Sequence, residues 1–207
     1  MNGWTIAKIL LAYEGGMVVR DNMERWKHYK SAREYADLAR KPLLMVGMPR
    51  QFWQPQSADV ILDIDPLVET IEGGIMADER DIPFPDKFFG ACYNAHTLEH
   101  MFTVEDCEIA INECTRVSDL TTFVCPSPYS IYANFFCPSH HLRLWFDQIN
   151  QRIKVTDNRF NTGMGLNTGG GYETPNSINQ ALVVHNAPEI VKIGSAYILG
   201  DTITVRG

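Results

Sequence analysis

Five short apolar runs constrain the fold of this chain more than any other feature of its sequence. They are mostly continuous rather than alternating, and they lie at residues 43–46, 59–64, 74–77, 91–95 and 120–125. Runs of this kind are typical of strands that are buried on both faces of a parallel sheet. The sequence therefore predicts an α/β fold with a Rossmann-like, mostly parallel sheet and flanking helices.

A capped helix separates the last two of these runs. Thr103 and Asp106 have the spacing of a capping box, in which a hydroxyl and an acidic side chain satisfy the first turn. Apolar residues then recur at helical spacing, at Val104, Cys107, Ile111 and Cys114. A strand, a helix and a strand in this order predict a βαβ unit.

The first part of the chain is rich in helix formers. We expect a short helix over residues 4–13 that ends at Gly15-Gly16, and a second helix over residues 21–39 that ends before Pro42. The apolar start has no cleavage-like site, so we interpret it as part of the mature chain rather than as a signal peptide.

The region after Pro126 has a looser pattern. Residues 140–151 predict one further helix, and the glycine-rich residues 163–176 predict a long loop. Three β-prone runs then predict antiparallel strands or hairpins near the C-terminus, at residues 181–185, 196–200 and 202–206. We interpret the whole as one domain, with residues 1–41 as an N-terminal helical extension and residues 42–207 as the α/β core.

Composition and charge argue against several classes of function. The formal net charge of -7 disfavours non-specific binding to nucleic acid, which needs a basic surface. No run of about 18 apolar residues is present, so we expect no membrane span. Five cysteines without a CxxC pair argue against a disulfide framework. We therefore expect a cytoplasmic protein with reduced thiols and with neither a nucleic-acid nor a membrane partner.

Residues 77–117 hold several short motifs in a fixed order. They are Asp78, Ile82-Pro83-Phe84-Pro85-Asp86, the apolar run at 91–95, Leu98-Glu99-His100 and Glu113-Cys114-Thr115-Arg116-Val117. This order resembles that of the class I S-adenosylmethionine-dependent methyltransferases, in particular the type 11-like group. The resemblance extends over about residues 43–146, because Pro126 and His140 or His141 fit the same layout.

The resemblance implies S-adenosyl-L-methionine as the cofactor. Asp63, at the end of the second apolar run, would accept hydrogen bonds from the ribose hydroxyls, with Asp65 as the near alternative. Asp78 would accept one from the adenine amino group. The backbone from Asn94 to His96 would line the methionine end of the cofactor.

The first apolar run and the turn after it depart from the family pattern. Only Gly47 remains of the glycine-rich turn, while Met45, Pro49 and Gln51 stand where an acid and two later glycines are expected. Only residues 48–58 separate the first two runs. We therefore expect the first helix of the family to be shortened or absent.

Histidines are candidates for positioning a methyl acceptor or taking its proton, because imidazole titrates near neutral pH. The resemblance places the loop after the fifth run beside the acceptor, so His141 or His140 is the first choice and His96 the next. No metal site is expected, because adjacent histidines do not share a helix face and no matching acid or thiol cluster is evident. We interpret Glu113 and Arg116 as a structural charge pair.

These observations leave more than one function open. The first is a divergent methyltransferase with an unidentified small-molecule or macromolecular acceptor. The second is a catalytically inactive domain that serves as an interaction or assembly module, with a protein partner or a second copy, and with Tyr129, Tyr132, Phe135 and Phe136 as its contact surface. A third is another nucleotide binder on a similar sheet, although the chain has neither a Walker-type loop nor a GxGxxG motif.

Overall fold

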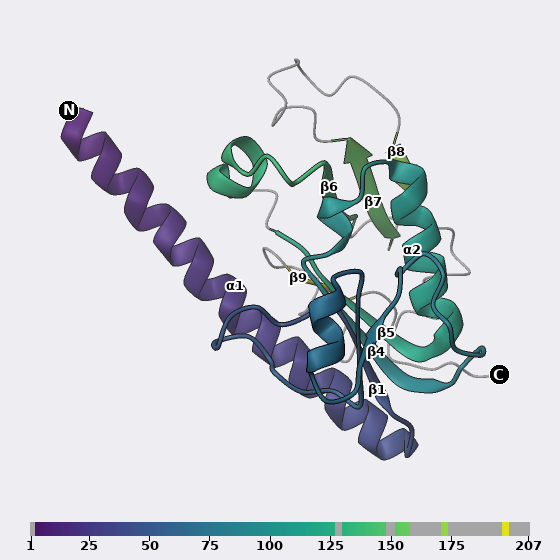
Figure 1. The fold of residues 1–207 in the computed structure, drawn as a ribbon. Coiled ribbons are helices and arrows are strands. Elements are labelled where there is room, and N and C mark those ends of the chain that lie inside the picture. The colour runs from purple at the N-terminus through teal and green to yellow at the C-terminus, as the bar shows by residue number, and fades with distance from the viewer. Residues whose placement is uncertain (1–2, 127–129, 148–151, 158–170, 174–195, 199–207) are drawn as a thin grey trace.

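The computed structural model describes residues 3–126, 130–147, 152–157, 171–173 and 196–198, and its main feature is a six-stranded sheet (Figure 1). The strands of this sheet run in the order β3-β2-β1-β4-β5-β9. Their bounds are β1 Leu43–Val46, β2 Val60–Asp63, β3 Gly74–Met76, β4 Phe89–Ala95, β5 Ser118–Val124 and β9 Ala196–Ile198. Strands β1 to β5 pair in parallel, and β9 pairs antiparallel with β5. This arrangement confirms the predicted α/β fold.

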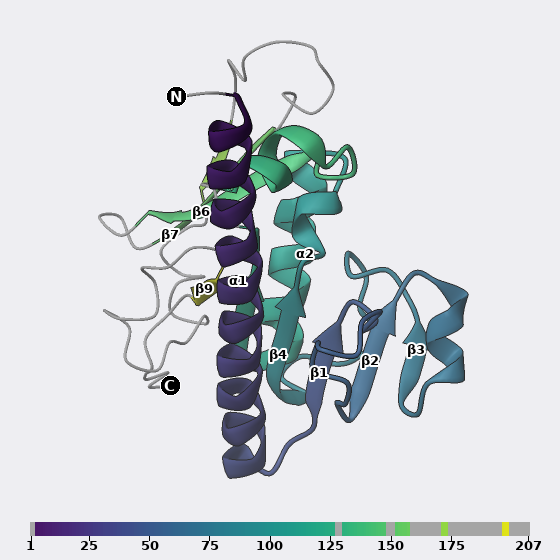
Figure 2. The ribbon, with the colours of Figure 1, turned by 90° about the vertical axis from the view of Figure 1, so that its left-hand side faces the viewer.

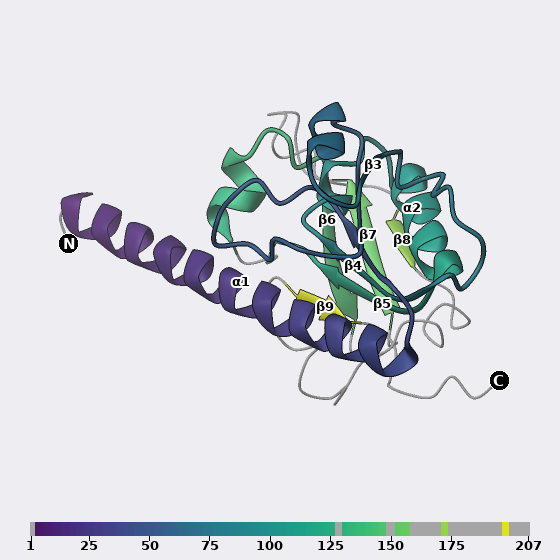
Figure 3. The same cartoon turned by 60° about the horizontal axis from the view of Figure 1, so that its bottom comes forward.

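Each face of the sheet packs on its own helix, which explains why the apolar runs do not alternate. In β1, Leu44 and Val46 belong to the core on the side of helix α2 (Val104–Val117). Leu43 and Met45 belong to the core on the side of helix α1 (Gly3–Ala39). Figures 2 and 3 show the two helices on opposite sides of the sheet. A strand that is covered on both faces is mostly apolar at every position instead of alternating.

Helix α1 is one continuous element, so the prediction of two helices separated by Gly15-Gly16 is wrong. Two glycines cost a helix about 1 kcal/mol each relative to alanine, which is too little to break it when both flanks are anchored. Glu14 supplies one anchor, because its carboxylate accepts hydrogen bonds from the backbone of Ile131 at 2.7 Å and from the Ser130 hydroxyl at 3.1 Å. The first turns of α1 project beyond the sheet (Figures 1 and 3).

The second half of α1 packs closely on β4. Its buried residues are His28, Ala32 and Ala36. A side chain at Gly90 in β4 would place its Cβ 2.9 Å from the Cα of Ala36. This close approach accounts for the glycine at position 90.

Helix α2 begins and ends as its sequence predicts. The Thr103 hydroxyl accepts a hydrogen bond from the Asp106 backbone at 3.0 Å. Arg116, in the last turn, lies 2.7 Å from Glu113 and donates to the carbonyl oxygens of Ile82 and Phe84 at 2.9 and 2.8 Å. The Glu113–Arg116 pair therefore holds the turn that precedes β4, as a structural charge pair should.

No helix lies between β1 and β2, which confirms the predicted loss of the family's first helix. Helix α1 holds this connection instead. Trp26 Nε1 donates to the Trp53 carbonyl oxygen and the Tyr29 hydroxyl donates to that of Ser57, both at 2.6 Å. Arg33 forms an ion pair with Asp59 at 2.7 Å.

The predicted helix over residues 140–151 is wrong, because this region contains a strand. Strands β6 (Leu142–Asp147), β7 (Arg152–Asp157) and β8 (Gly171–Glu173) form a second, antiparallel sheet. Leu142 and Leu144 alternate with a half-buried Arg143 and pack on the α2 side of the core, which is a strand pattern.

The last part of the chain is described only in part. Strand β8 lies inside the predicted loop, and β9 lies inside the predicted strand at 196–200 and is antiparallel, as expected. The other two predicted strands, at 181–185 and 202–206, lie outside the described residues.

Across the described residues, no helix has the combination of length and apolar character that a membrane crossing requires. None of the five cysteines, all of which lie among the described residues, forms a disulfide, and Cys137 alone of them is not buried.

Candidate functional site

A large cavity lies at the carboxyl ends of the parallel strands, between the sheet and α1. It encloses about 1300 Å³, more than the few hundred to about 1000 Å³ of a typical small-molecule site. Five of the seven residues predicted to bind the cofactor or to act in catalysis line it: Gly47, Asp63, Asp78, His96 and His140. Asn94 and His141 are not among its lining residues.

Gly47 begins the turn after β1, and its backbone has a conformation that favours glycine. Its φ is +91°, and its N–H donates to the Leu62 carbonyl oxygen at 2.8 Å. A Cβ at this position would lie 2.7 Å from Cγ2 of Thr97. The single glycine that is left from the family motif is therefore required both by its φ and by the close approach of the segment after β4.

Two backbone N–H groups hold the carboxylate of Asp63, one at each oxygen. Oδ2 accepts a hydrogen bond from the Met48 N–H at 2.7 Å, and Oδ1 accepts one from the Asp65 N–H at 2.8 Å. A carboxylate offers about four acceptor positions, so two remain for a ligand. Asp65 is used differently, because it caps a short 3-10 helix at Leu67 and pairs with Arg50 at 2.8 Å.

Asp78 lines the same cavity but already has a cationic partner. Arg80 contacts both of its carboxylate oxygens, the shorter contact being 2.6 Å, and also reaches Asp106 at 2.6 Å. The hydrogen bonds from Arg80 lower the pKa of Asp78, so this carboxyl group is ionised at neutral pH. An adenine amino group would share Asp78 with Arg80.

Asn94 is buried, and its side chain contacts Glu79, a buried acid of the cavity lining that the sequence did not single out. Its amide donates to Glu79 at 2.7 Å, and the Thr97 hydroxyl donates to the same carboxyl oxygen at 3.0 Å. Burial raises the pKa of Glu79 to about 7, despite these two hydrogen bonds. Glu79 follows Asp78 directly, and no feature of the sequence indicates that Glu79 is buried while Asp78 is half-exposed.

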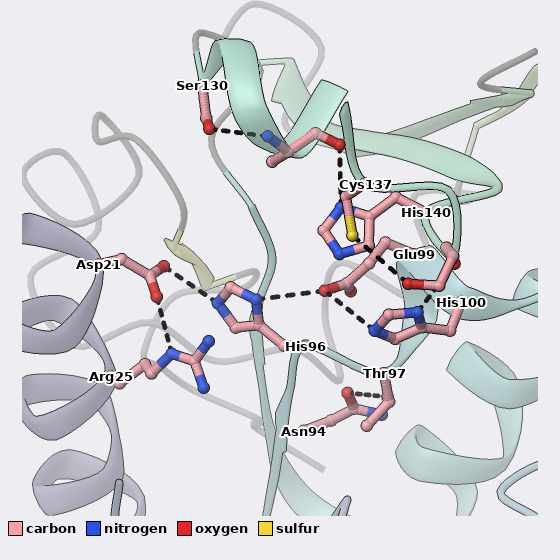
Figure 4. A network of polar contacts seen from close by, with 12 residues as sticks. Asp21, Arg25, Asn94, His96, Thr97, Glu99, His100, Ser130, Cys137 and His140 are labelled. Carbon is pink, nitrogen blue, oxygen red and sulfur yellow. Dashed lines mark hydrogen bonds and ion pairs between the residues drawn. The ribbon is translucent and has the colours of Figure 1, made fainter. Parts of the chain in front are cut away.

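His96 joins α1 to the segment after β4 (Figure 4). It has a φ of +59°, and its ring lies between two carboxylates, with Nε2 3.0 Å from Asp21 and Nδ1 3.2 Å from Glu99. Burial opposes a charge on His96, but the two carboxylates outweigh this effect and raise its pKa. A ring that is held on both sides by carboxylates suits a structural role better than proton abstraction, so a catalytic role for His96 stays a prediction.

The remaining histidines occupy two different environments. His140 lines the cavity, and its Nδ1 lies 3.0 Å from the Ala133 carbonyl oxygen. His141 instead stacks on Phe102, with ring centroids 4.8 Å apart, while its backbone N–H donates to the Glu99 carbonyl oxygen at 2.8 Å. Of the two first-choice histidines, only His140 therefore faces the cavity.

The predicted aromatic group lies partly at the cavity wall. Tyr132 and Phe136 line the cavity and keep exposed fractions of 60% and 69%. Phe135 is also exposed, at 45%, and Tyr129 lies outside the described residues.

Comparison with known proteins agrees with the sequence resemblance. Residues 56–119 match the family model described as a methyltransferase domain. This segment contains Asp63, Asp78, β4 and α2, which are the elements that carried the resemblance. The match covers less than a third of the chain, and together with the α/β fold it supports the resemblance to the class I S-adenosylmethionine-dependent methyltransferases.

The other comparisons add little to this result. The PH0226 protein from Pyrococcus horikoshii OT3, a solved structure, is 12% identical and aligns over 61% of this chain and 70% of its own, with a TM-score of 0.31. A likeness of this size carries no argument about activity. No curated protein sequence matches the chain.

Proposed function

We propose that this chain is an S-adenosyl-L-methionine-dependent methyltransferase that binds its cofactor in the cavity. One observation carries the proposal. Gly47, Asp63 and Asp78 lie at or just after the carboxyl ends of three adjacent parallel strands and line one hollow. In open α/β sheets, ligands bind at the carboxyl ends of the strands, and a carboxylate there suits a ribose.

The residues that surround the cavity have distinct roles in this proposal. Asp63 accepts hydrogen bonds from the ribose through its two remaining acceptor positions, and Asp78 accepts one from the adenine amino group. The methionine end lies beside the turn at Gly47 and the backbone of Ala95 and His96. When bound, the cofactor supplies a methyl group on an electrophilic sulfonium. The chain supplies alignment, on which a methyl transfer depends more than on acid–base catalysis.

The acceptor side of the cavity is the less defined part of the proposal. His140 is the residue that can take a proton there, because burial lowers its pKa and keeps the ring neutral near pH 7. Among the described residues, α1 and the segment at 130–136 surround the space beside it. The acceptor, a protein partner and a cytoplasmic location remain proposals.

Calorimetric titration with S-adenosyl-L-methionine tests cofactor binding. We expect saturable heat for the unaltered chain and an affinity about 10- to 100-fold weaker for Asp63→Asn, because the amide offers one acceptor oxygen instead of two. Glu72→Gln is the matched control, since Glu72 is exposed and precedes β3, at the amino-terminal end of the strands rather than the carboxyl end. Circular dichroism checks that both variants fold.

The absence of heat at millimolar cofactor would contradict the proposal. An inactive interaction module would then be the better explanation of the fold. Equal affinities for Asp63→Asn and the unaltered chain would leave cofactor binding intact but would remove Asp63 from the site.

A further inference from the structure

Three potential metal ligands converge at the rim of the cavity, although none of them was expected to bind a metal. Glu99 and His100 come from the short 3-10 helix Leu98–His100, and His140 comes from the chain 40 residues later. One ligand atom from each lies within 4.8 Å of the other two (Figure 4). All three residues line the cavity.

Glu99 has a buried carboxylate whose hydrogen-bonding capacity is unmet. Its side chain is 2% exposed, and neither oxygen has a hydrogen-bond partner among the described residues. Oε1 lies 3.2 Å from His96 Nδ1, which is within ion-pair range but outside hydrogen-bond geometry. His96 offsets part of the cost of burying this carboxylate at Oε1, but Oε2 has no hydrogen-bond partner among the described residues, and a further cation would complete it.

The two histidines are held in the tautomer that a metal requires. His100 Nδ1 lies 2.8 Å from the Ser139 carbonyl oxygen, and His140 Nδ1 lies 3.0 Å from that of Ala133. A carbonyl oxygen only accepts, so each Nδ1 must carry the hydrogen, and the lone pair of each neutral ring is on Nε2. Metal-binding histidines typically donate their other N–H to a backbone carbonyl or carboxylate in this manner.

We propose that Glu99, His100 and His140 bind a divalent transition-metal ion of the zinc type, with its fourth position open to the cavity. Two imidazoles and one carboxylate are an established donor set for zinc, and three protein ligands with one open position are typical of reactive rather than structural sites. The open position would take water or an oxygen or sulfur atom of a bound acceptor, and with the metal bound His140 would act as a ligand rather than as the group that takes the acceptor's proton.

Binding requires only a small rearrangement of these side chains. Tetrahedral coordination at about 2.1 Å places ligand atoms about 3.4 Å apart. The separation between His100 Nε2 and Glu99 Oε1 is 4.0 Å. His100 is 44% exposed, so it can move toward the buried Glu99 without disturbing the core.

Metal titration of the full-length, tag-free and chelator-treated protein tests the proposal. We expect calorimetry to show one equivalent of Zn²⁺ bound, and Co²⁺ to give the visible absorption of a tetrahedral or five-coordinate site. Mg²⁺ should not compete, because it prefers oxygen ligands in octahedral geometry. His100→Ala should weaken Zn²⁺ binding about 100-fold or more, and its exposure makes it the variant that leaves folding intact.

His141→Ala is the matched control, because it removes the neighbouring imidazole, which stacks on Phe102 outside the cluster. It should bind Zn²⁺ as the unaltered chain does. The proposal is overturned if the unaltered chain binds no Zn²⁺, or if His100→Ala and His141→Ala have equal effects. Glu99→Gln, monitored by circular dichroism, should abolish the Co²⁺ spectrum. These titrations contain no S-adenosyl-L-methionine, so their failure is distinct from failure of the proposed methyltransferase function.

Discussion

The carboxyl group of Glu79 should make the stability of this fold depend on pH. Its pKa is raised from 4.5 to about 7 by burial, so the folded state keeps a proton that the unfolded chain has lost above pH 4.5. The stabilisation is therefore complete below pH 4.5 and is lost as the pH rises through 7.

Glu79→Gln isolates this effect, because glutamine mimics the protonated acid and can still accept from Asn94 and Thr97. Relative to this variant, the unaltered chain should lose about 3 kcal/mol of unfolding free energy between pH 4.5 and pH 8. Urea denaturation at several pH values measures the difference. A constant difference across this range would show that Glu79 does not titrate as its burial implies.

Gly47→Ala should destabilise the turn that leads into the cavity. The φ of +91° is strained for alanine, and the new Cβ would push against the Thr97 methyl group at 2.7 Å. We expect a loss of about 1–3 kcal/mol in thermal unfolding, together with weaker binding of S-adenosyl-L-methionine. An unchanged melting temperature and affinity would mean that the turn can relax without cost.

At the scale of elements, α1 contains two glycines at which alanine should stabilise the fold, in contrast to Gly47. Gly15 and Gly16 have no positive φ, and a Cβ at either position would meet no atom within 4 Å. Gly15→Ala and Gly16→Ala should each stabilise the helix, by up to about 1 kcal/mol. Far-ultraviolet circular dichroism should show equal or greater helicity. Lower helicity would contradict the prediction, because it would mean that the glycines are needed for a bend in the helix, which the structure does not contain.

The parts of the fold that were predictable are those with local causes. Thr103 and Asp106 cap α2 through neighbouring residues, and the apolar run of β1 reflects burial on both faces. The continuity of α1 was not predictable, because the Glu14 anchor lies 117 residues away from its partner Ile131. In β6, the family layout favoured a helix, although Leu142 and Leu144 alternate as in a strand.

The site was predictable to the same limited extent. Gly47, Asp63 and Asp78 each follow a predicted strand, and the edge of a parallel sheet brings such positions together. Glu99 gave no comparable signal, because its potential as a metal ligand depends on His140, which only the tertiary fold places beside it. His96 depends in the same way on Asp21 of α1.

At the scale of the whole molecule, the cavity depends on segments that are far apart in the sequence. Helix α1 forms one wall through residues that include Leu10, Glu14 and Asp21. The segment at 130–136 forms a neighbouring part of the wall. Glu14 joins the two by its hydrogen bonds to Ser130 and Ile131, so the shape of the cavity should depend on this contact.

Glu14→Ala should therefore open the cavity without unfolding the sheet. Loss of two hydrogen bonds to one carboxylate leaves the Ile131 N–H without its acceptor, and we expect its amide hydrogen to exchange at least about 10-fold faster. Amides of β4 and β5 should keep their protection, since their hydrogen bonds lie within the sheet. Glu34→Ala is the matched control, because Glu34 is an exposed residue of the same helix. Equal exchange at Ile131 in both variants would mean that the segment at 130–136 is held by other contacts and that α1 does not close the cavity.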